Sequence, residues 1–370
     1  MRIIFICGSI EPGMNGVGDY TRSLAIAFIN RGYEARILAI NEQKLPNDGT
    51  INYLQSESNI SVETYRLSSG ISWQERQVIA KKIIAQYEPT YVSLQFVPFS
   101  YHPKGLPSFL PNWLSGLKSN GQSWQIMFHE LWVADSKANS VKELILRELQ
   151  KVIINKLLKK IKPSQIITSN DYYCNMLRRI GYKADVMPIF SNLPKGEILE
   201  IPNIENRKDK VIGVFFGNIQ SNNSVVDKII TISAAIQEQM NKELVVLHIG
   251  NNRNNIMLDL FKKLNEANVE AYALGFIAAN DAANVIASSD VGFSNYLPEL
   301  IYKSGSISSM LYNGIPVLLL GDKQNSEMVD VPEVRRLKDV LNMKDFIMQE
   351  KTFSSRYSAD NTFNKMQQSF

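Results

Sequence analysis

Short, almost continuously apolar runs alternate along the chain with longer stretches of helical spacing. In the first half these runs are RIIFIC, EARILAI, YVSLQFV, WQIMFHE, SQIITS and ADVMPI. The stretch DYTRSLAIAFINRG, between the first two runs, has a helical pattern that Gly32 is expected to end. Strands that are covered on both faces of a parallel sheet show such uninterrupted apolar runs. The pattern therefore predicts an α/β fold built from βαβ units.

The same alternation starts again in the second half, with VIGVFFG, ELVVLHIG, VEAYALG, DVGFSN and GIPVLLLG. Residues 188–210 lie between the halves, and their lack of periodicity and their Pro, Asn and charge content predict an interdomain linker. The chain has 370 residues, more than the ~250–300 that a single core supports. We therefore expect two Rossmann-like domains facing each other across a cleft, residues 1–190 and residues 191–354.

Composition narrows the class of protein. Hydrophobic residues make up 45% of the chain and charged residues 21%, as in ordinary globular proteins. The net charge of +4 is too small to indicate nucleic-acid binding. Cys7 and Cys174 are expected to be buried, reduced thiols, and the start MRIIFICGSIEPG lacks the length and cleavage site of a signal peptide. No sequence run reaches the ~18 apolar residues of a membrane span, so we expect a cytoplasmic protein.

The glycine-rich stretch after the first predicted strand has two interpretations, a dinucleotide loop or backbone lining a substrate cleft. Ligands of open α/β sheets bind outside the carboxyl ends of the strands, where this stretch lies. Gly16 starts the nearest match to a dinucleotide fingerprint, but it comes late after the strand, and Thr21 stands at the third glycine position. A cleft is therefore the better interpretation. Gly18 and Asp19 are expected to end the loop just before the helix.

Two further strand ends carry candidate chemistry. His129 follows the run WQIMF and would point into the predicted cleft, although a lone histidine beside a strand is often only structural. In the second half, Lys303, Ser304, Gly305 and Ser306 open a predicted helix that ends at Asn313 and Gly314. Free N–H groups at a helix start, with hydroxyls and a lysine, form an anion site. The alternative is a helix that is merely capped by serine.

The segments NGVGDYTRSLAIAFINRGYEARIL, VSLQFVPFSYHPKGLP, IMFHELWV, IITSNDYY, MPIFSNLP and KSGSISSMLYNGIPVL occur in an order that resembles family-4-type, retaining bacterial glycosyltransferases of the GT-B architecture. The resemblance covers most of the chain. It implies that a hexose is transferred from a nucleotide diphosphate sugar, usually UDP-linked, with retention and without a cofactor or essential metal. It implies a glycan or lipid-linked acceptor in envelope or extracellular polysaccharide biosynthesis. It also implies that the tail, residues 355–370, returns to the first domain.

The resemblance assigns roles residue by residue. His129, Glu299 and Lys303 would act at the reacting sugar and diphosphate. The acceptor side would comprise Gly16, Asp19, Tyr20 and Glu130. The donor would be bound by Gly217, Asn218, Gly275, Phe276, Ser304, Gly305, Ser306, Ser309, Gly18 and Arg253, with Gly250 beside Arg253 in the same loop.

The sequence departs from the family at the donor site. Asn218 and Asn223 stand where related enzymes carry an arginine and a lysine that grip the diphosphate. The two family glutamates, eight positions apart, correspond to Ile301 and Ser309, so Glu299 is the nearest carboxylate. Because a dianionic leaving group needs compensating charge, the helix start at Lys303 is expected to replace the missing basic residues.

Residues 140–162 form a basic, amphipathic helical pattern. Such a helix is either the solvated face of a core helix or a surface that docks on an anionic membrane. A lipid-linked acceptor favours docking at the inner face of the plasma membrane. Two other functions stay open: a sugar-nucleotide epimerase of the same fold, and a non-catalytic protein that binds sugar nucleotides.

Overall fold

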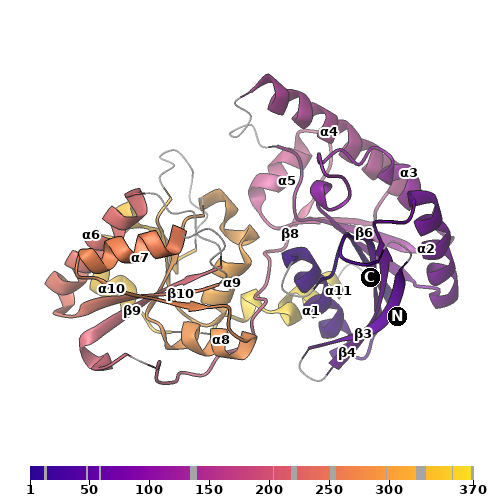
Figure 1. The fold of residues 1–370 in the computed structure, drawn as a ribbon. Helices are drawn as coiled ribbons and strands as arrows, with labels where there is room; N and C mark the ends of the chain where they lie inside the picture. Colours follow the sequence, from indigo (N-terminus) through magenta and orange to yellow (C-terminus); the bar gives the residue numbers. More distant parts are fainter. Residues whose placement is uncertain are drawn as a thin grey trace. The chain divides into compact units, whose positions relative to one another are not determined.

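The computed structural model describes residues 1–11, 15–46, 49–57, 60–133, 140–202, 204–217, 223–250, 256–296, 298–321, 331–351 and 353–367 (Figure 1). The chain forms two compact units. Unit 1 comprises Met1–Pro188 and Ala359–Phe370, and unit 2 comprises Ile189–Ser358. The expected divisions lie after residue 190, from the sequence pattern, and after residue 354, from the family resemblance.

Unit 1 contains β1 (Arg2–Cys7), α1 (Gly16–Asn30), β2 (Glu34–Glu42), β3 (Thr50–Glu57), β4 (Ile60–Ser68), α2 (Trp73–Tyr87), β5 (Tyr91–Phe96), α3 (Leu110–Ser115), β6 (Ser123–Phe128), α4 (Val141–Ile161), β7 (Gln165–Thr168), α5 (Asp171–Arg178), β8 (Asp185–Val186) and α11 (Ala359–Gln367). Its sheet has the order β3-β4-β2-β1-β5-β6-β7-β8. The pairs are parallel except for the antiparallel pair β3–β4. The apolar runs thus form the expected parallel sheet.

Helices cover both faces of this sheet. Side chains of α2, α3, α4 and α5 pack on one face, against alternate residues of β5 and β6 such as Leu94 and Ile126. On the other face, Phe28 of α1 meets Phe5 of β1 and Phe363 of α11, with ring centroids 5.6 and 4.7 Å apart. The C-terminal helix α11 is therefore part of unit 1, where it packs on α1.

Unit 2 contains β9 (Lys210–Phe216), α6 (Asn223–Met240), β10 (Glu243–Ile249), α7 (Ile256–Glu266), β11 (Glu270–Gly275), α8 (Ala279–Ser288), β12 (Val291–Ser294), α9 (Gly305–Tyr312), β13 (Val317–Leu319), β14 (Val334–Arg336) and α10 (Met343–Ile347). The sheet order is β11-β10-β9-β12-β13-β14, and every pair is parallel. Helices α6, α7 and α10 pack on one face and α8 and α9 on the other.

The structure differs from the sequence-based predictions at three places. The run ADVMPI yields only the two-residue strand β8, because Pro188 lacks the N–H that a longer ladder needs. The hairpin β3–β4 was not predicted at all. The supposed linker packs onto unit 2: the N–H groups of Gly196, Glu197 and Leu199 donate to side chains of unit 2. This segment belongs to unit 2 rather than forming a free connection.

The two cysteines match the prediction of buried thiols. Cys7, in β1, and Cys174, in α5, are both buried and free. Burial raises the pKa of each thiol, that of Cys174 to about 11. Both are protonated and unreactive at neutral pH.

Candidate functional site

Each sheet has a topological switch point, where successive strands are added on opposite sides of the first strand. Open α/β sheets bind ligands at this point. In unit 1 this point lies between the carboxyl ends of β1 and β5. In unit 2 it lies between β9 and β12. Most of the predicted site residues that the structure describes follow these strands or their neighbours.

In unit 2, three neighbouring strands end at glycines with positive φ. Gly217, Gly250 and Gly275 follow or close β9, β10 and β11, with φ of 88°, 148° and 71°. The Gly217 N–H donates to the Ile249 carbonyl at 2.8 Å, and the Gly250 N–H donates to the Gly275 carbonyl at 2.9 Å. Left-handed backbone without side chains leaves this edge open to close approach by a ligand. Gly217 and Gly275 were both predicted as donor-site residues.

The start of α9 lies against this glycine edge. Ser304 is the N-cap, and its hydroxyl accepts the Ile307 N–H at 3.2 Å. A Cβ placed on Gly217 would lie only 2.9 Å from Ser306 Oγ. The structure thus brings Gly217 and Ser306, which are far apart in sequence, into contact at the switch point. Lys303 ends a short 3-10 turn, Pro298–Lys303, directly before the cap.

The expected bounds of this helix are confirmed, and one assigned residue inside it is buried. α9 ends at Tyr312, with Asn313 as C-cap and Gly314 at a φ of 77°. Ser309 is completely buried, and its hydroxyl lies 3.0 Å from the Ser191 hydroxyl. Ser309 would have to become accessible to contact a ribose, and its predicted role stays a prediction.

The remaining donor-site predictions are only partly described. Phe276 is 77% exposed next to Gly275. Asn218 and Arg253 lie outside the described residues, and so do the side chains of Asn223 and Glu299. Their predicted roles stay predictions.

In unit 1, the glycine-rich stretch is helical earlier than expected. Asn15, not Gly18 or Asp19, is the N-cap, and its side chain accepts the N–H groups of Val17 and Gly18 at 3.1 Å. Asparagine is among the strongest N-caps, which explains why the helix begins at Gly16. Gly13 lies outside the described residues.

Gly16 and Gly18 differ in whether the structure has room for a side chain at their position. A Cβ on Gly18 would lie 2.7 Å from the Ser9 carbonyl oxygen and 2.8 Å from Ile10 Cα. A Cβ on Gly16 would meet nothing within 4 Å. Close packing of the loop after β1 onto α1 thus requires a glycine at position 18, whereas position 16 is open.

One predicted acceptor-side residue, Asp19, is linked through Arg22 to the unpredicted hairpin. Asp19 pairs with Arg22 at 2.5 Å, and the Arg22 guanidinium donates to Gln55 of β3 at 3.3 Å. Gln55 in turn donates to the Ile10 carbonyl at 3.2 Å. This chain of contacts ties the start of α1 to the loop after β1.

A buried ion pair fixes the same loop and was missed from the sequence. Arg66 of β4 contacts Glu42, at the end of β2, at 2.9 Å, and also Glu11. Glu42 accepts the Ile10 N–H at 2.6 Å and the Ser9 hydroxyl at 2.9 Å. Burial alone would lower the pKa of Arg66, but its hydrogen bonds to Glu42 and Glu11 outweigh burial and raise it. Glu42, which ends the run EARILAINE, was the available signal.

His129 and Tyr20, predicted on the two sides of the reaction, meet each other. Their rings are edge to face with centroids 4.9 Å apart, and both side chains are 2% exposed. His129 Nε2 lies 2.8 Å from Gln95 Oε1 of β5. Glu130 follows immediately and is half-buried, and its N–H reaches the Phe96 carbonyl at 3.5 Å. His129 is thus hydrogen-bonded and buried in this structure, and its predicted role at the sugar stays a prediction.

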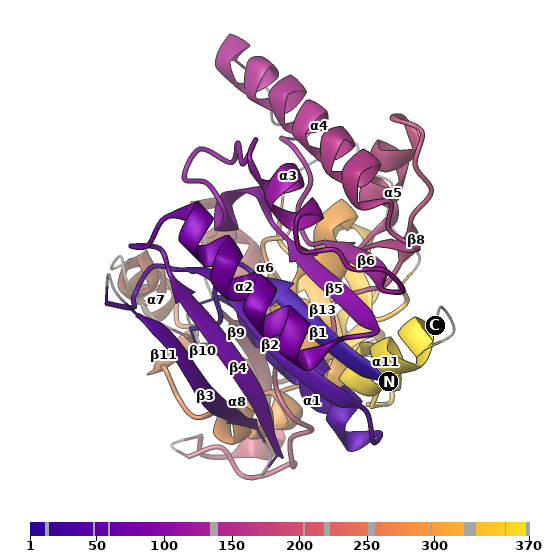
Figure 2. The same ribbon diagram turned by 90° about the vertical axis from the view of Figure 1, so that its right-hand side faces the viewer.

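The helix α4 carries an unusual outward face. Its buried residues, among them Ile154, Leu157 and Ile161, lie on one side. The large apolar residues of the opposite side are exposed: Val141 by 72%, Ile145 by 56%, Leu149 by 47% and Val152 by 65%. The apolar residues of α4 therefore split between two faces. The amino-terminal end of α4 extends beyond the neighbouring elements of unit 1 (Figures 1 and 2).

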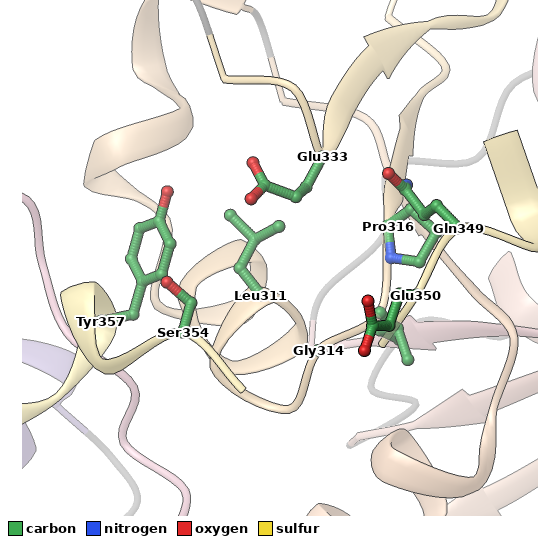
Figure 3. Close-up of a pocket in the computed structure, with 9 residues that line it drawn as sticks. Leu311, Gly314, Pro316, Glu333, Gln349, Glu350, Ser354 and Tyr357 are labelled. Atoms are coloured by element: carbon green, nitrogen blue, oxygen red, sulfur yellow. The ribbon is translucent and has the colours of Figure 1, made fainter. Parts of the chain in front are cut away.

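A small cavity in unit 2 lies away from these candidate residues. It has a volume of about 20 Å³ and is lined by Leu311, Gly314, Glu333, Glu350 and Tyr357 among others, at the carboxyl end of α9 (Figure 3). Such a volume holds about one water molecule. It is too small for a substrate.

No group of three or more His, Cys, Asp or Glu side chains in the described part of the chain could hold a metal ion. Among the same residues, no helix has the length and apolarity needed to cross a bilayer.

Comparison with solved structures identifies the architecture. Trehalose-phosphate synthase from Burkholderia xenovorans superposes with a TM-score of 0.61 at 9% identity, over 100% of both chains. HepE from Anabaena, in complex with UDP and glucose, gives 0.56 at 13% identity, again over 100% of both chains. The chain has the GT-B fold.

The same fold also includes an epimerase. UDP-GlcNAc 2-epimerase from Methanocaldococcus jannaschii gives a TM-score of 0.52 at 12% identity over 100% of both chains. No family model and no curated protein matches the sequence. GT-B architecture is therefore established by structure alone, and it is compatible with more than one reaction.

Proposed function

We propose that this GT-B protein is a retaining glycosyltransferase that moves a hexose from a UDP-sugar, such as UDP-glucose, to a glycan or lipid-linked acceptor in envelope or extracellular polysaccharide biosynthesis. The observation that carries the proposal is the start of α9, where Ser306 lies against Gly217 at the switch point of unit 2. The fold that it shares with HepE, which was solved with UDP and with UDP-glucose, supports the UDP-linked donor.

The diphosphate would bind at the start of α9. The first N–H groups of a helix have no carbonyl partner within the helix and carry partial positive charge. Gly305 and Ser306 supply such N–H groups, Ser306 adds a hydroxyl beside Gly217, and Lys303 brings a full positive charge. These groups would stabilise the charge that develops on the leaving diphosphate.

The other predicted residues complete the proposal. Phe276 and Gly275 would receive the base, and Glu299 and His129 would position the donor sugar. Gly16, Asp19, Tyr20 and Glu130 would shape the acceptor side. The contacts of Asp19 with Arg22 and of Tyr20 with His129 give this side a defined geometry.

A thermal-shift panel tests the donor site. UDP, GDP, ADP, UDP-glucose and NAD would be added to the wild type, to Lys303→Ala and to Lys344→Ala, a matched change on an exposed lysine of α10. A ligand at 100 times its Kd stabilises by about 2.7 kcal/mol. We expect a shift with UDP and UDP-glucose that Lys303→Ala weakens and Lys344→Ala keeps. A shift with NAD alone, or with none of the five, contradicts the proposal.

Retention and metal independence have separate tests. The anomeric configuration of the first product, read by NMR before mutarotation, is expected to equal that of the donor. Turnover is expected to survive EDTA. An inverted product or a loss of activity that Mg²⁺ or Mn²⁺ restores would overturn the corresponding part of the proposal.

The partner surface is proposed to be an anionic membrane, bound through the outward face of α4. Exposed Val141, Ile145, Leu149 and Val152 follow helical spacing, and exposed Lys156, Lys159 and Lys160 continue the helix. An apolar stripe joined to lysines is the composition of helices that lie in the membrane interface. Each lysine near an anionic surface contributes about 1 kcal/mol. This arrangement would bring the enzyme to a lipid-linked acceptor.

Vesicle flotation tests the surface. We expect the protein to bind anionic phosphatidylglycerol vesicles and not neutral phosphatidylcholine vesicles. The binding to phosphatidylglycerol should fall when Lys156, Lys159 and Lys160 become glutamine. The control replaces Lys208, Lys338 and Lys344, exposed lysines of unit 2, by glutamine for the same change in net charge. Ile145→Ser with Val152→Ser is expected to weaken binding even at low salt. Equal binding by all variants would remove the membrane from the proposal.

An epimerase is the second candidate, because the fold is shared with UDP-GlcNAc 2-epimerase. An epimerase would convert UDP-GlcNAc without any acceptor. Incubation of the protein with UDP-GlcNAc alone, followed by NMR of the sugar, separates the two: a changed sugar that is still linked to UDP would favour the epimerase.

A further inference from the structure

Two neighbouring strands of unit 1 carry a polar row inside the protein. Successive residues of a strand point to opposite faces. In β5, Ser93 and Gln95 share one face, and in the adjacent β6 Gln125 and the following His129 lie on the matching face, with Ser93 paired to Gln125. Leu94 and its neighbours on the other face belong to the apolar core. All four polar side chains are at most 2% exposed.

These side chains form one continuous hydrogen-bonded chain. Gln95 Nε2 donates to Ser93 Oγ at 2.7 Å, and the Ser93 hydroxyl donates to Gln125 Oε1. Gln95 Oε1 lies 2.8 Å from Nε2 of His129. Polar groups buried in this way need partners, and a chain in which each member has one is a stable arrangement.

The direction of the chain determines where the imidazole proton lies. A hydroxyl has one hydrogen to donate, and Ser93 gives it to Gln125. Ser93 therefore accepts from Gln95, which uses the NH₂ end of the Gln95 amide. Only the carbonyl end of Gln95 then faces His129, and an oxygen can only accept. Nε2 of His129 must carry the hydrogen.

We propose that Ser93, Gln95 and Gln125 are positioning residues that keep the proton of His129 on Nε2 and hold its ring in one orientation. In the neutral ring Nδ1 then has the lone pair, and any partner of Nδ1 is a donor, a hydroxyl or an N–H group. The identity of that donor rests on the proposed function: in the transferase, a hydroxyl of the sugar is such a donor. Partners that fix the tautomer of a functional histidine are a general device of active sites.

Nitrogen NMR tests the proposal directly. The chain has three histidines, His102, His129 and His248, so histidine-selective ¹⁵N labelling gives spectra that His102→Asn and His248→Gln suffice to assign. We expect His129 to be protonated on Nε2 in one tautomer. The reversed chain, with every donor and acceptor exchanged, would place the proton on Nδ1. A neutral ring with that proton on Nδ1, or a mixture in the wild type, overturns the proposal.

Three substitutions test whether the chain, and not the fold in general, holds the proton. Ser93→Ala removes the link that orients Gln95, so the His129 signals are expected to shift to a mixture of tautomers. Gln95→Glu offers only acceptor oxygens and is expected to keep a proton on Nε2. Thr168→Ala removes another buried hydroxyl of the same sheet, which donates to the Phe128 carbonyl, and serves as control. Its His129 signals should match the wild type.

The outcomes separate this inference from the proposed function. If Ser93→Ala leaves His129 as unchanged as Thr168→Ala does, in variants whose circular dichroism matches the wild type, the positioning chain is wrong. That result would leave the nucleotide panel untouched. Failure to bind any nucleotide would remove the transferase, while the tautomer of His129 could still follow Ser93 and Gln95 as expected.

Discussion

The carboxyl edges of the two sheets differ in the kinds of residue that form them. In unit 1 the loop after β1 is held by long side chains: Glu42 and Arg66 form a buried ion pair, and Gln55 bonds the loop backbone. In unit 2 the corresponding edge consists of glycines, with Gly217 against the small hydroxyl of Ser306. The difference teaches that one edge is fixed by side chains from neighbouring strands, whereas the other leaves backbone accessible.

This contrast fits the proposed division of labour. A diphosphate is bound well by backbone N–H groups, which need small neighbours so that the ligand can approach. On the proposed acceptor side, a network of buried side chains gives the loop after β1 a defined shape. Four predictions would break or sharpen the comparison.

The largest effect is expected at the buried ion pair of unit 1. Glu42→Ala leaves Arg66, whose side chain is 9% exposed, without its buried partner. Breaking one side of such a pair lowers the free energy of unfolding by about 3–5 kcal/mol. The control is Glu63→Ala, because Arg36 and Glu63 join the same two strands but are 29% and 28% exposed. There the loss should be about 1 kcal/mol or less. Urea denaturation measures both, and equal losses would contradict the special role of the Glu42 pair.

The next effect separates the two glycines of α1. Gly18→Ala forces a Cβ against the Ser9 carbonyl and Ile10 Cα, and overpacking of this kind costs about 1–3 kcal/mol. Gly16→Ala meets open space and gains helix propensity, so it should be neutral or stabilising by up to about 1 kcal/mol. Thermal unfolding of both variants is the measurement. A stable Gly18→Ala would mean that the loop after β1 can yield.

A third prediction concerns the glycine edge of unit 2. Gly217 and Gly181 have the same φ of 88°, but only Gly217 has a neighbour, Ser306, where a Cβ would go. Alanine at either position strains the backbone by about 1–2 kcal/mol. Only Gly217→Ala should weaken UDP binding, by about tenfold or 1.4 kcal/mol, in calorimetric titration. An equal loss of affinity in Gly181→Ala would show that the effect is general strain.

The smallest effect is a pH dependence at the end of β10. His248 is buried, with Nε2 2.8 Å from the Gly217 carbonyl, and burial lowers its pKa below the usual value near 6.5. As pH falls below about 6.5, the unfolded chain therefore takes up a proton on His248 more readily than the folded chain does. Because of this difference, the free energy of unfolding decreases on acidification. His248→Gln, which can still donate to Gly217, should flatten that part of a plot of Tm against pH between 5 and 8. An unchanged slope would assign the acid sensitivity to other groups.

Much of the architecture could be predicted from the sequence, because buried parallel strands are nearly continuous runs of apolar residues. Most of the apolar runs form strands, and the bounds of α9 followed from Ser304 and Gly314. The hairpin β3–β4 was missed because TINYLQSE and ISVETYRLS mix polar and apolar residues, as an edge pair does. The cap at Asn15 was missed because the adjacent glycines looked like the end of a loop.

The site was less predictable, for a reason that particular residues show. Sequence could propose Gly217 and Ser306 separately, but only the crossing of β9 and α9 at a switch point puts them in contact. Ser309 stands at the sequence position of a family glutamate, yet the turn of α9 buries it against Ser191. His129 was recognised at its strand end, while Gln95 and Ser93 gave no sign that they hold it.

The sequence by itself determined the α/β class, the two sheets and the identity of the helix that starts at Ser304, because periodicity and capping are local properties of the chain. Only the tertiary structure decided that Gly18 is indispensable while Gly16 is not, that Glu42 and Arg66 close the loop after β1, and that α4 exposes one apolar face. Those facts depend on which distant segments come within a few ångströms of one another. Such distances follow from the packing of whole helices and strands and leave no mark in any single stretch of sequence.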